Sequence, residues 1–356
     1  MTDVVAVAPE EKAGSGRSAF KTIPGLLISA FFLWFTFFPH GPIWILPAGR
    51  GISIAEIMAL RAVKPTWILG IVGFTAASYT LRCVRWTRMM RSTGAKFPVC
   101  ARVLMTSLAA NNILPLRIGD IMRVFTYAGD LGASPSVILS TVILEKLLDI
   151  FILVLLFVLT MGSNASAHSK AIAETLLAIS TVGLLTLILG ARAMKAPLES
   201  FFTKHSGNAK IAKIEHMIML ALDCLLEIGI AGSMLLLVQS AVIWFCEGMI
   251  FVSAAQTIGL LTDWIGPWQA VSVANLSYLI PSSPGAIGTF EFAVKTGLVT
   301  HGASEPRAAL YGLALHAWLL VSVTGAGGLI FLAHRAQRPD PKPLREEIET
   351  LPAELS

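Results

Sequence analysis

Residues 115–120 read P-L-R-I-G-D, and residues 284–289 read P-G-A-I-G-T, so one P-x-x-I-G phrase occurs twice, 169 positions apart. Each copy lies in an apolar stretch that proline and glycine interrupt. Backbone that leaves the helix at membrane depth is tolerated only where it lines a protein cavity. Paired interruptions in corresponding halves of a membrane chain are therefore typical of a carrier's substrate site.

The composition predicts an integral membrane protein. Hydrophobic residues make up 55% of the 356 residues, charged residues only 14%, and the mean hydropathy is +0.72. A run of about 20 apolar residues is long enough to cross a bilayer. We expect six crossings, near residues 20–39, 66–86, 137–160, 171–193, 232–255 and 308–333.

Two further apolar stretches, 97–128 and 268–300, are cut by Pro and Gly into pieces too short for ordinary crossings. We interpret both as re-entrant hairpins. The predicted fold class is thus an all-α polytopic membrane protein with about six full transmembrane helices and two re-entrant hairpins. The cysteines show no C-x-x-C spacing and are expected to be small buried hydrophobic residues.

The domain organisation follows from these segments. Residues 1–19 form a predicted cytoplasmic tail, residues 20–335 the membrane domain, and residues 336–356 a second cytoplasmic tail. Basic residues precede the first apolar run and no small-residue cleavage site follows it, so we expect a retained anchor. An amphipathic pattern near 208–231 predicts a surface helix that joins the two halves.

Basic residues with little acidic company cluster at 82–102, 192–213 and 335–345, and these segments are predicted to be cytoplasmic. The net charge of +5 is then a topology signal, with contact to an anionic lipid surface as a further expectation. No nucleic-acid-binding signature is present, so we expect no nucleic acid partner.

Threading six crossings with both termini inside makes the two hairpins enter from opposite faces. Adding 169 to the start of the 66–86 helix gives 235, near the start of the 232–255 helix. Adding 169 to the start of the 137–160 helix gives 306, near the start of the 308–333 helix. We therefore predict an inverted-topology repeat with pseudo-repeats at 20–160 and 171–335.

Ionisable residues at membrane depth are functional-site candidates, because each costs about 2.5 to 3.5 kcal/mol to insert. In the first half they follow Asn111 and Asn112. They are Arg117, Asp120, Arg123, Glu145, Lys146 and Asp149. Glu145 and Asp149 share a helical face, and we expect them to pair with Arg117 and Arg123. Substrate contact and a purely structural clasp both remain open.

In the second half, the break at 281–285 predicts a new helix beginning near Ala286. Its free N–H groups and positive dipole end would suit an anionic headgroup. Glu291 and Lys295 are four residues apart and could simply neutralise each other.

Four other residues receive structural interpretations. Glu247 is expected to face the bundle interior, as a headgroup or proton contact or as a hydrogen-bonded structural acid. His316 is expected to be a satisfied interior histidine, and Trp86 and Trp264 are expected to be interfacial anchors.

Several phrases resemble one known family. They are N-N-I-L-P-L-R-I-G-D-I-M-R at 111–123, L-E-K-L-L-D at 144–149, the Arg85-Trp86 pair and P-S-S-P-G-A-I-G-T-F-E at 281–291. They resemble the flippase-like integral membrane family, which includes the transmembrane region of lysylphosphatidylglycerol synthetase. The resemblance covers residues 20 to 335. It implies a multi-pass protein of a prokaryotic plasma (inner) membrane, both termini cytoplasmic, that moves a lipid between leaflets or assists in doing so.

Carried over by position, the resemblance implies two sets of site residues. The substrate-binding set is Asn112, Arg117, Asp120, Arg123, Glu145, Asp149 and Glu291. The hairpin-forming set is Pro115, Gly119, Pro284, Gly285 and Gly288, to which the break at 281–285 adds Pro281. Asp120 departs from the pattern, since relatives more often have Glu there. About 20 polar residues follow the last helix, so lipid aminoacylation by this chain alone is not expected.

We therefore expect a lipid transporter, not an enzyme, that carries an anionic phospholipid or isoprenoid-type lipid through a midplane polar cavity without a cofactor or metal. One alternative is a membrane-embedded lipid or polyprenyl-phosphate sugar transferase. That chemistry usually needs clustered acids to hold a metal or act as a general base, whereas loop 40–65 contains a single acid, Glu56. Another is a non-transporting partner subunit of a lipid-biosynthetic enzyme. The lipid, the direction, the energy source and a homo-oligomeric state are left open, and no Walker A phrase is present.

Overall fold

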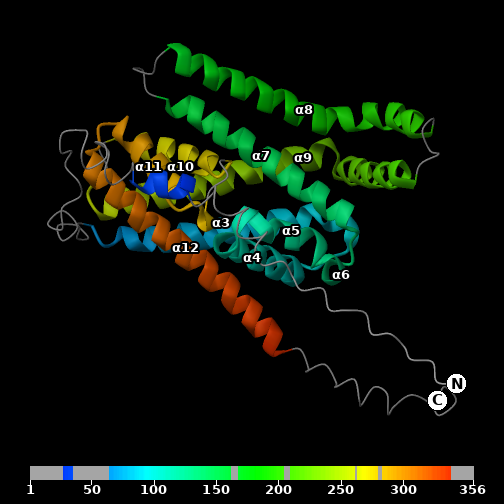
Figure 1. Ribbon diagram of the computed structural model, residues 1–356, viewed down its shortest axis with the longest axis horizontal. Helices are drawn as coiled ribbons and strands as arrows, with labels where there is room; N and C mark the ends of the chain where they lie inside the picture. Colours follow the sequence, from blue (N-terminus) through cyan, green and yellow to red (C-terminus); the bar gives the residue numbers. More distant parts are fainter. Residues whose placement is uncertain are drawn as a thin grey trace, which may run out of the picture.

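The structure is a computed structural model that describes residues 27–34, 64–161, 167–203, 209–260, 263–279 and 283–337. These residues form helices and turns without a β-strand, which confirms the all-α class. Figure 1 shows the helices gathered into one bundle. After a helix at 27–34, the elements are α3 Trp67–Met89, η1 Arg91–Thr93, α4 Phe97–Ile113, η2 Pro115–Arg117, α5 Ile118–Phe125, α6 Ala128–Leu131, α7 Pro135–Thr160, α8 Ala167–Thr203, α9 Ala209–Thr257, α10 Gly266–Ser277, η3 Pro284–Ala286, α11 Thr289–Val299 and α12 Glu305–Ala336.

Four stretches of the described helices are long and apolar enough to cross a membrane. They are α3, Ala167–Gly190 of α8, Leu226–Thr257 of α9, and α12. Helix α7 has 26 residues, but it carries Glu145, Lys146 and Asp149. Only 27–34 of the expected first crossing lies within the described residues. The chain is thus a multi-pass membrane protein, and the count of six crossings stays a prediction.

Both interrupted stretches are broken helices. The first runs α4, η2, α5 and the second runs α10, η3, α11, and the two short turns η2 and η3 contact each other. Arg117 ends η2 in a left-handed conformation. In the second stretch Gly285, Ala286 and Gly288 all have positive φ, so α11 begins at Thr289. The expected helix start near Ala286 was therefore wrong by about one turn. Pro281 lies outside the described residues.

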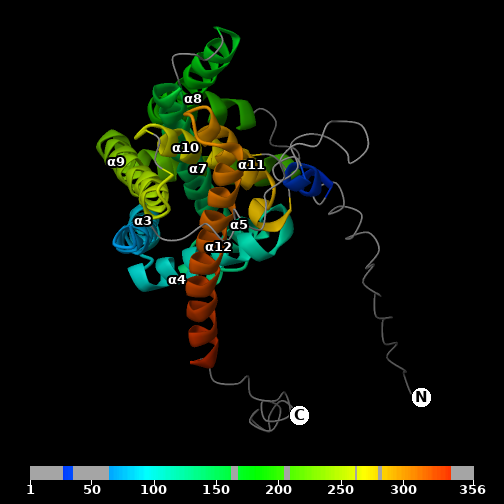
Figure 2. The ribbon, with the colours of Figure 1, turned by 90° about the vertical axis from the view of Figure 1, so that its left-hand side faces the viewer.

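The bounds of the broken stretches recur at a fixed offset. Helices α4 and α10 begin at Phe97 and Gly266, and η2 and η3 differ by the same 169 positions at both ends. Helix α12 packs on α4, and α7 packs on α10. Figure 2, viewed from the side, shows α12 running past α4 and α5.

Individual contacts follow the same offset. The Trp244 indole donates to Asp149 at 3.1 Å, and the Trp318 indole donates to Thr75 at 3.1 Å. The two pairs are equivalent, because Thr75 and Trp244 differ by 169 positions and so do Asp149 and Trp318. Ser78 and Glu247, themselves 169 apart, are joined by a hydrogen bond of 2.8 Å. Contacts between counterpart residues are expected near a two-fold axis between the halves, and this contact joins α3 to α9.

Helix α8 and the first part of α9 form an arm at one side of the bundle (Figure 1), whereas the rest of α9 packs against α3, α7 and α10. Gly229 kinks α9 with φ 66° and ψ 177°, which separates residues 209–228 from residues 230–257. The Lys195 ammonium contacts Asp223 at 2.5 Å and so joins the two helices, and this hydrogen bond raises the pKa of Lys195. Residues 209–228 are helical as expected near 208–231, and their surface position stays a prediction.

Candidate functional site

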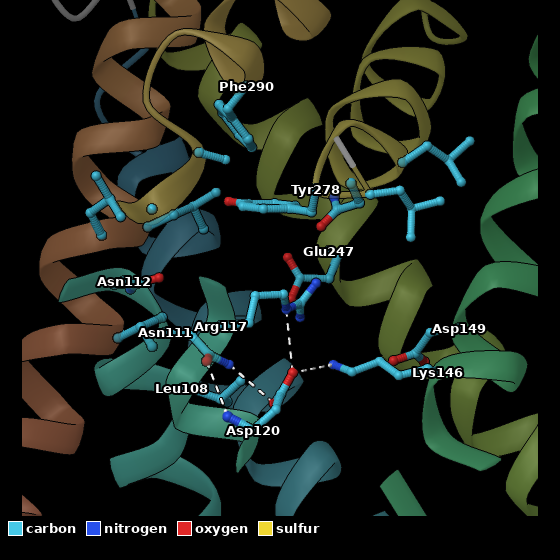
Figure 3. Close-up of a pocket in the computed structure, with 18 of the residues that line it drawn as sticks. Leu108, Asn111, Asn112, Arg117, Asp120, Lys146, Asp149, Glu247, Tyr278 and Phe290 are labelled. Carbon is cyan, nitrogen blue, oxygen red and sulfur yellow. Dashed lines mark hydrogen bonds and ion pairs between the residues drawn. The ribbon is translucent and has the colours of Figure 1, made fainter. Parts of the chain in front are cut away.

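A cavity of about 580 Å³ lies where the two broken helices meet (Figure 3). This volume is within the range that holds small-molecule ligands. Both turns contribute to the wall through Arg117, Pro284 and Gly285. The ionisable lining consists of Arg82, Arg117, Asp120, Glu145, Lys146, Asp149 and Glu247.

Arg117 and Lys146 both reach Asp120, in Figure 3 from above and from the right. The distances to Asp120 Oδ2 are 3.3 Å from Arg117 Nε and 3.7 Å from Lys146 Nζ. Asn111 completes the cluster, because its amide donates to Asp120 Oδ1 at 3.1 Å and accepts the Asp120 N–H at 3.2 Å. The Arg117 side chain remains 45% exposed. This part of the wall therefore presents a cation to the cavity.

The backbone of Arg117 has φ 54°, a conformation that L-residues adopt at a cost of about 1 to 2 kcal/mol. Gly119, two residues later, lies so close to α4 that an added Cβ would overlap the Ser107 carbonyl oxygen. Close docking of α5 against α4 therefore requires glycine here. Strained backbone persists where the surroundings determine it, and it gathers at functional sites.

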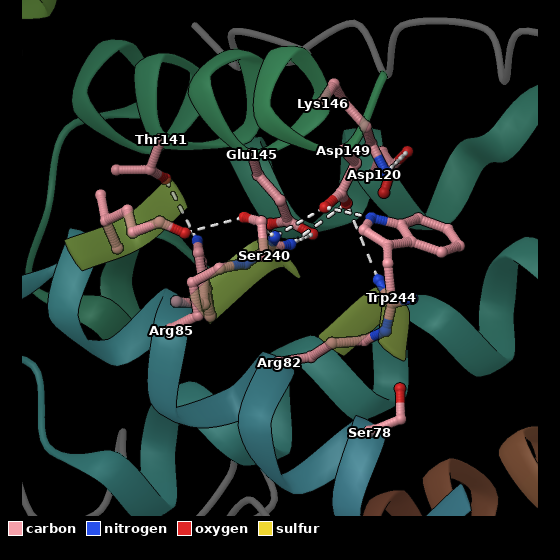
Figure 4. A network of polar contacts seen from close by, with 12 residues as sticks. Ser78, Arg82, Arg85, Asp120, Thr141, Glu145, Lys146, Asp149, Ser240 and Trp244 are labelled. Carbon is pink, nitrogen blue, oxygen red and sulfur yellow. Dashed lines mark hydrogen bonds and ion pairs between the residues drawn. The ribbon is translucent and has the colours of Figure 1, made fainter. Parts of the chain in front are cut away.

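Behind Glu145 and Asp149 lies a buried ion-pair network between α3 and α7 (Figure 4). Arg85 is 1% exposed and contacts Asp149 at 2.6 and 3.1 Å and Glu145 at 3.5 Å. Arg123 is fully buried, pairs with Glu145 and lies over the Trp86 ring. Each acid thus has a buried cation behind it.

Glu247 faces the bundle interior, as expected. It accepts hydrogen bonds from Ser78 at 2.8 Å and from Arg82 at 3.0 Å. Arg82 also reaches Asp149 at 3.7 Å and lies over the Trp244 ring. The guanidinium of Arg82 therefore bridges acids from both halves of the chain across the cavity wall.

The second broken helix uses its acid differently. Glu291 accepts the Gly288 N–H at 2.7 Å and contacts His316 Nδ1 at 2.8 Å. His316 is 1% exposed and stacks on Phe290, which lines the cavity. Glu291 therefore caps its own helix.

Several expected contacts were wrong. Arg117 pairs with Asp120 and not with the acids of α7, while Asp149 takes Arg85 and Arg82. Lys295 lies 4.0 Å from Glu305, so Glu291 and Lys295 do not form the i,i+4 pair. The Gly288 N–H that was expected to be free for a headgroup is capped by Glu291.

Three residues of α3 were placed in the wrong environment by sequence reasoning. Arg82 and Arg85 were counted among cytoplasmic basic residues, but they lie inside α3 and hold the network together. Trp86 was expected at the membrane interface, yet it is fully buried and donates to Thr141 at 3.1 Å. Their position within the predicted crossing at 66–86 was the available signal.

The structure brings most of the expected substrate-binding residues to the cavity. Asn112, Arg117, Asp120, Glu145 and Asp149 line it, and Asn112 also donates to Thr324 at 3.1 Å. The cavity wall does not include Arg123, which lies behind Glu145, or Glu291, which lies beside His316. Sequence reasoning missed further lining residues, among them Tyr79, Trp244 and Tyr278.

The described residues contain no group of three or more His, Cys, Asp or Glu placed to hold a metal ion. The polar side chains in the cavity lining are charged groups, amides, the hydroxyls of Tyr79, Tyr278 and Ser283, and the Trp244 indole.

Residues 22–327 match the family described as the lysylphosphatidylglycerol synthase TM region. A curated protein, the glycosyltransferase AglD of Haloferax volcanii, is 22% identical over 310 residues. The match covers 77% of this chain and 49% of AglD, so the chain spans about half the length of that relative. The comparison with solved structures found no significant match.

Proposed function

Since this chain belongs to the lysylphosphatidylglycerol synthase transmembrane region family, we propose that it moves a lipid between membrane leaflets, with the headgroup passing through the cavity between the broken helices. One observation carries the proposal. A cavity of ligand size joins both interrupted helices and is lined by ionisable side chains in an otherwise apolar chain. Such residues at membrane depth mark substrate pathways.

The headgroup would bind at the first broken helix. Arg117 offers a guanidinium whose only ion-pair contact among the described residues is through Nε to Asp120. Guanidinium groups suit phosphate because they donate paired hydrogen bonds in a fixed fork. Asn112 and Tyr278 supply neutral polar groups beside it. The acyl chains would remain in the bilayer.

Movement would come from the repeat. We propose that 20–160 and 171–335 are inverted-topology repeats whose broken helices are re-entrant, in a plasma membrane with both termini cytoplasmic. The recurring contacts at an offset of 169 support this arrangement. Rocking one repeat against the other about the axis near Ser78 would expose the cavity alternately to each face.

The test is leaflet exchange in liposomes that contain the purified protein and headgroup-labelled phospholipid. We expect wild type to exchange lipid and Arg117→Ala to lose most of that activity. Ala286 holds the same backbone conformation at the equivalent position, so alanine is compatible with this turn. Arg307→Ala, an exposed arginine outside the cavity lining, is the matched control and should exchange normally. Equal exchange by Arg117→Ala and wild type would contradict the site.

A second candidate is a transferase that uses a lipid-linked sugar, which the likeness to the glycosyltransferase AglD favours. It predicts sugar transfer from a polyprenyl-phosphate sugar by the purified chain. Transfer without leaflet exchange would replace the first proposal by this one. A partner subunit of a lipid-biosynthetic enzyme would instead show neither activity alone and would copurify with that enzyme.

A further inference from the structure

The charges around the cavity do not balance. Four acids are present, and each has at least one cation within 4.0 Å. Five cations are tied into the same set of contacts. The acids are Asp120, Glu145, Asp149 and Glu247, and the cations are Arg82, Arg85, Arg117, Arg123 and Lys146. The set therefore carries one positive charge in excess.

The excess lies on the cavity side. Arg85 and Arg123 are at most 1% exposed, and both face the carboxylates of α7. Arg117 and Lys146 share one acid, Asp120, and their side chains are 45% and 33% exposed. One of these two cations is uncompensated. Glu291 is not part of this set, because it lies outside the cavity lining and its carboxylate contacts His316 and the Gly288 N–H.

An unbalanced charge at membrane depth is unfavourable. A ligand that carries one negative charge removes the excess, whereas a neutral ligand leaves it and a dianion reverses it. A phosphodiester has one negative charge, and a phosphomonoester has about 1.5 to 2. We propose that the cavity selects a headgroup with a single net negative charge, a phosphodiester rather than a phosphomonoester or a diphosphate. This inference rests on the proposed function and names its substrate class.

The same contacts provide the variants for a test. Lys146→Met removes one cation and balances the set, so a net-neutral headgroup should then be preferred. Asp120→Asn raises the excess to two positive charges and should shift the preference to a dianionic headgroup. The amide oxygen of the new side chain can still accept the hydrogen bond from Asn111. Arg102→Met and Asp130→Asn make the same charge changes in an ion pair outside the cavity lining. These two controls should keep the wild-type preference.

The transport experiment uses liposomes with labelled phosphatidylglycerol, phosphatidylethanolamine or phosphatidic acid. Wild type should exchange phosphatidylglycerol at least about tenfold faster than either of the others, because only that headgroup leaves no net charge in the cavity. Lys146→Met should favour phosphatidylethanolamine, and Asp120→Asn should favour phosphatidic acid. Exchange that ignores headgroup charge, or preferences unchanged in both variants, would overturn the inference and leave lipid translocation standing.

A binding experiment separates the two proposals. The thermal unfolding midpoint of the detergent-solubilised protein is measured with glycerophosphoglycerol, a monoanion, and with glycerol phosphate, a dianion. Stronger stabilisation of wild type by the monoanion, together with stronger stabilisation of Asp120→Asn by the dianion, supports the charge selection. This result would hold even if the protein exchanges no lipid. The ligand would then be a soluble phosphodiester. Equal stabilisation by both compounds in wild type and variant would overturn it.

Discussion

Arg117 and Ala286 lie 169 residues apart at the ends of η2 and η3, and both hold a left-handed backbone, with φ 54° and 57°. The positive φ, and not the side chain, is common to these two positions, while Gly285 and Gly288 have positive φ that their counterparts Leu116 and Gly119 do not. One half places a guanidinium at this point and the other a methyl group. Both broken helices thus line the cavity, while its charge comes mainly from the first half.

Ala286→Gly should stabilise the protein. Glycine adopts positive φ without the penalty of about 1 to 2 kcal/mol that alanine carries there, and a larger unfolded-state entropy offsets about 0.4 to 1 kcal/mol of the gain. We expect a net stabilisation of roughly 0.5 to 1 kcal/mol, seen as a higher unfolding midpoint in detergent. Ala293→Gly, inside α11, should instead lower the midpoint. A lower midpoint for Ala286→Gly would refute the assigned backbone geometry.

Gly119→Ala should destabilise the first broken helix. Its Cβ would overlap the Ser107 carbonyl oxygen, and overpacking of this kind costs about 1 to 3 kcal/mol. Gly129→Ala is the matched control, because nothing lies within 4 Å of a Cβ there. Denaturation of the two variants should differ clearly, with Gly129→Ala at or above wild type. Equal stabilities would mean that α5 does not dock closely on α4.

Arg85→Met should be among the most damaging single changes in α3. It leaves Asp149 without its closest cation, and breaking a buried ion pair costs about 3 to 5 kcal/mol. Arg85→Met combined with Asp149→Leu should recover part of the loss, since no unpaired charge remains at that contact. Lys195→Met, in the pair with Asp223 on the α8–α9 arm, should leave the unfolding midpoint unchanged. A mild effect of Arg85→Met would argue against a buried network.

Glu291 provides a test of the second broken helix. Glu291→Ala removes the acceptor for the Gly288 N–H and the partner of His316, and an unsatisfied buried group costs about 1 to 3 kcal/mol. Glu291→Gln keeps an acceptor oxygen and should lose less than half as much stability. Comparison of the two unfolding midpoints decides the point. If glutamine proves as damaging as alanine, the carboxylate charge rather than the hydrogen bonds holds this turn.

Local sequence signals predicted the breaks in the helices well. Proline and glycine at 115–119 and 284–288 act on their own backbone, so η2 and η3 fall where the repeated phrase does. The helix that contains the acids Glu145 and Asp149 was expected at 137–160 and is found at Pro135–Thr160.

Partners distant in sequence could not be predicted in the same way. Which arginine faces Asp149 depends on how α3 is rotated against α7, and the sequence pattern of α3 leaves that rotation undetermined. Arg85 was consequently assigned to a cytoplasmic cluster. The Glu291–His316 pair, which joins α11 to α12, was not foreseen for the same reason. Arg117 is a different case, because its partner Asp120 lies only three residues away and the predicted pairing with α7 overlooked this local contact.

A reversible plug in the cavity tests the lipid pathway most directly. Ser283→Cys places a thiol in the cavity lining of a chain whose four own cysteines are replaced by alanine, and Gly129→Cys serves as the control outside the lining. Leaflet exchange is measured before and after each thiol is joined by a disulfide to a bulky group, and again after reduction. The account predicts exchange by both variants before modification, loss only in modified Ser283→Cys, and recovery on reduction. Undiminished exchange by fully modified Ser283→Cys would contradict it.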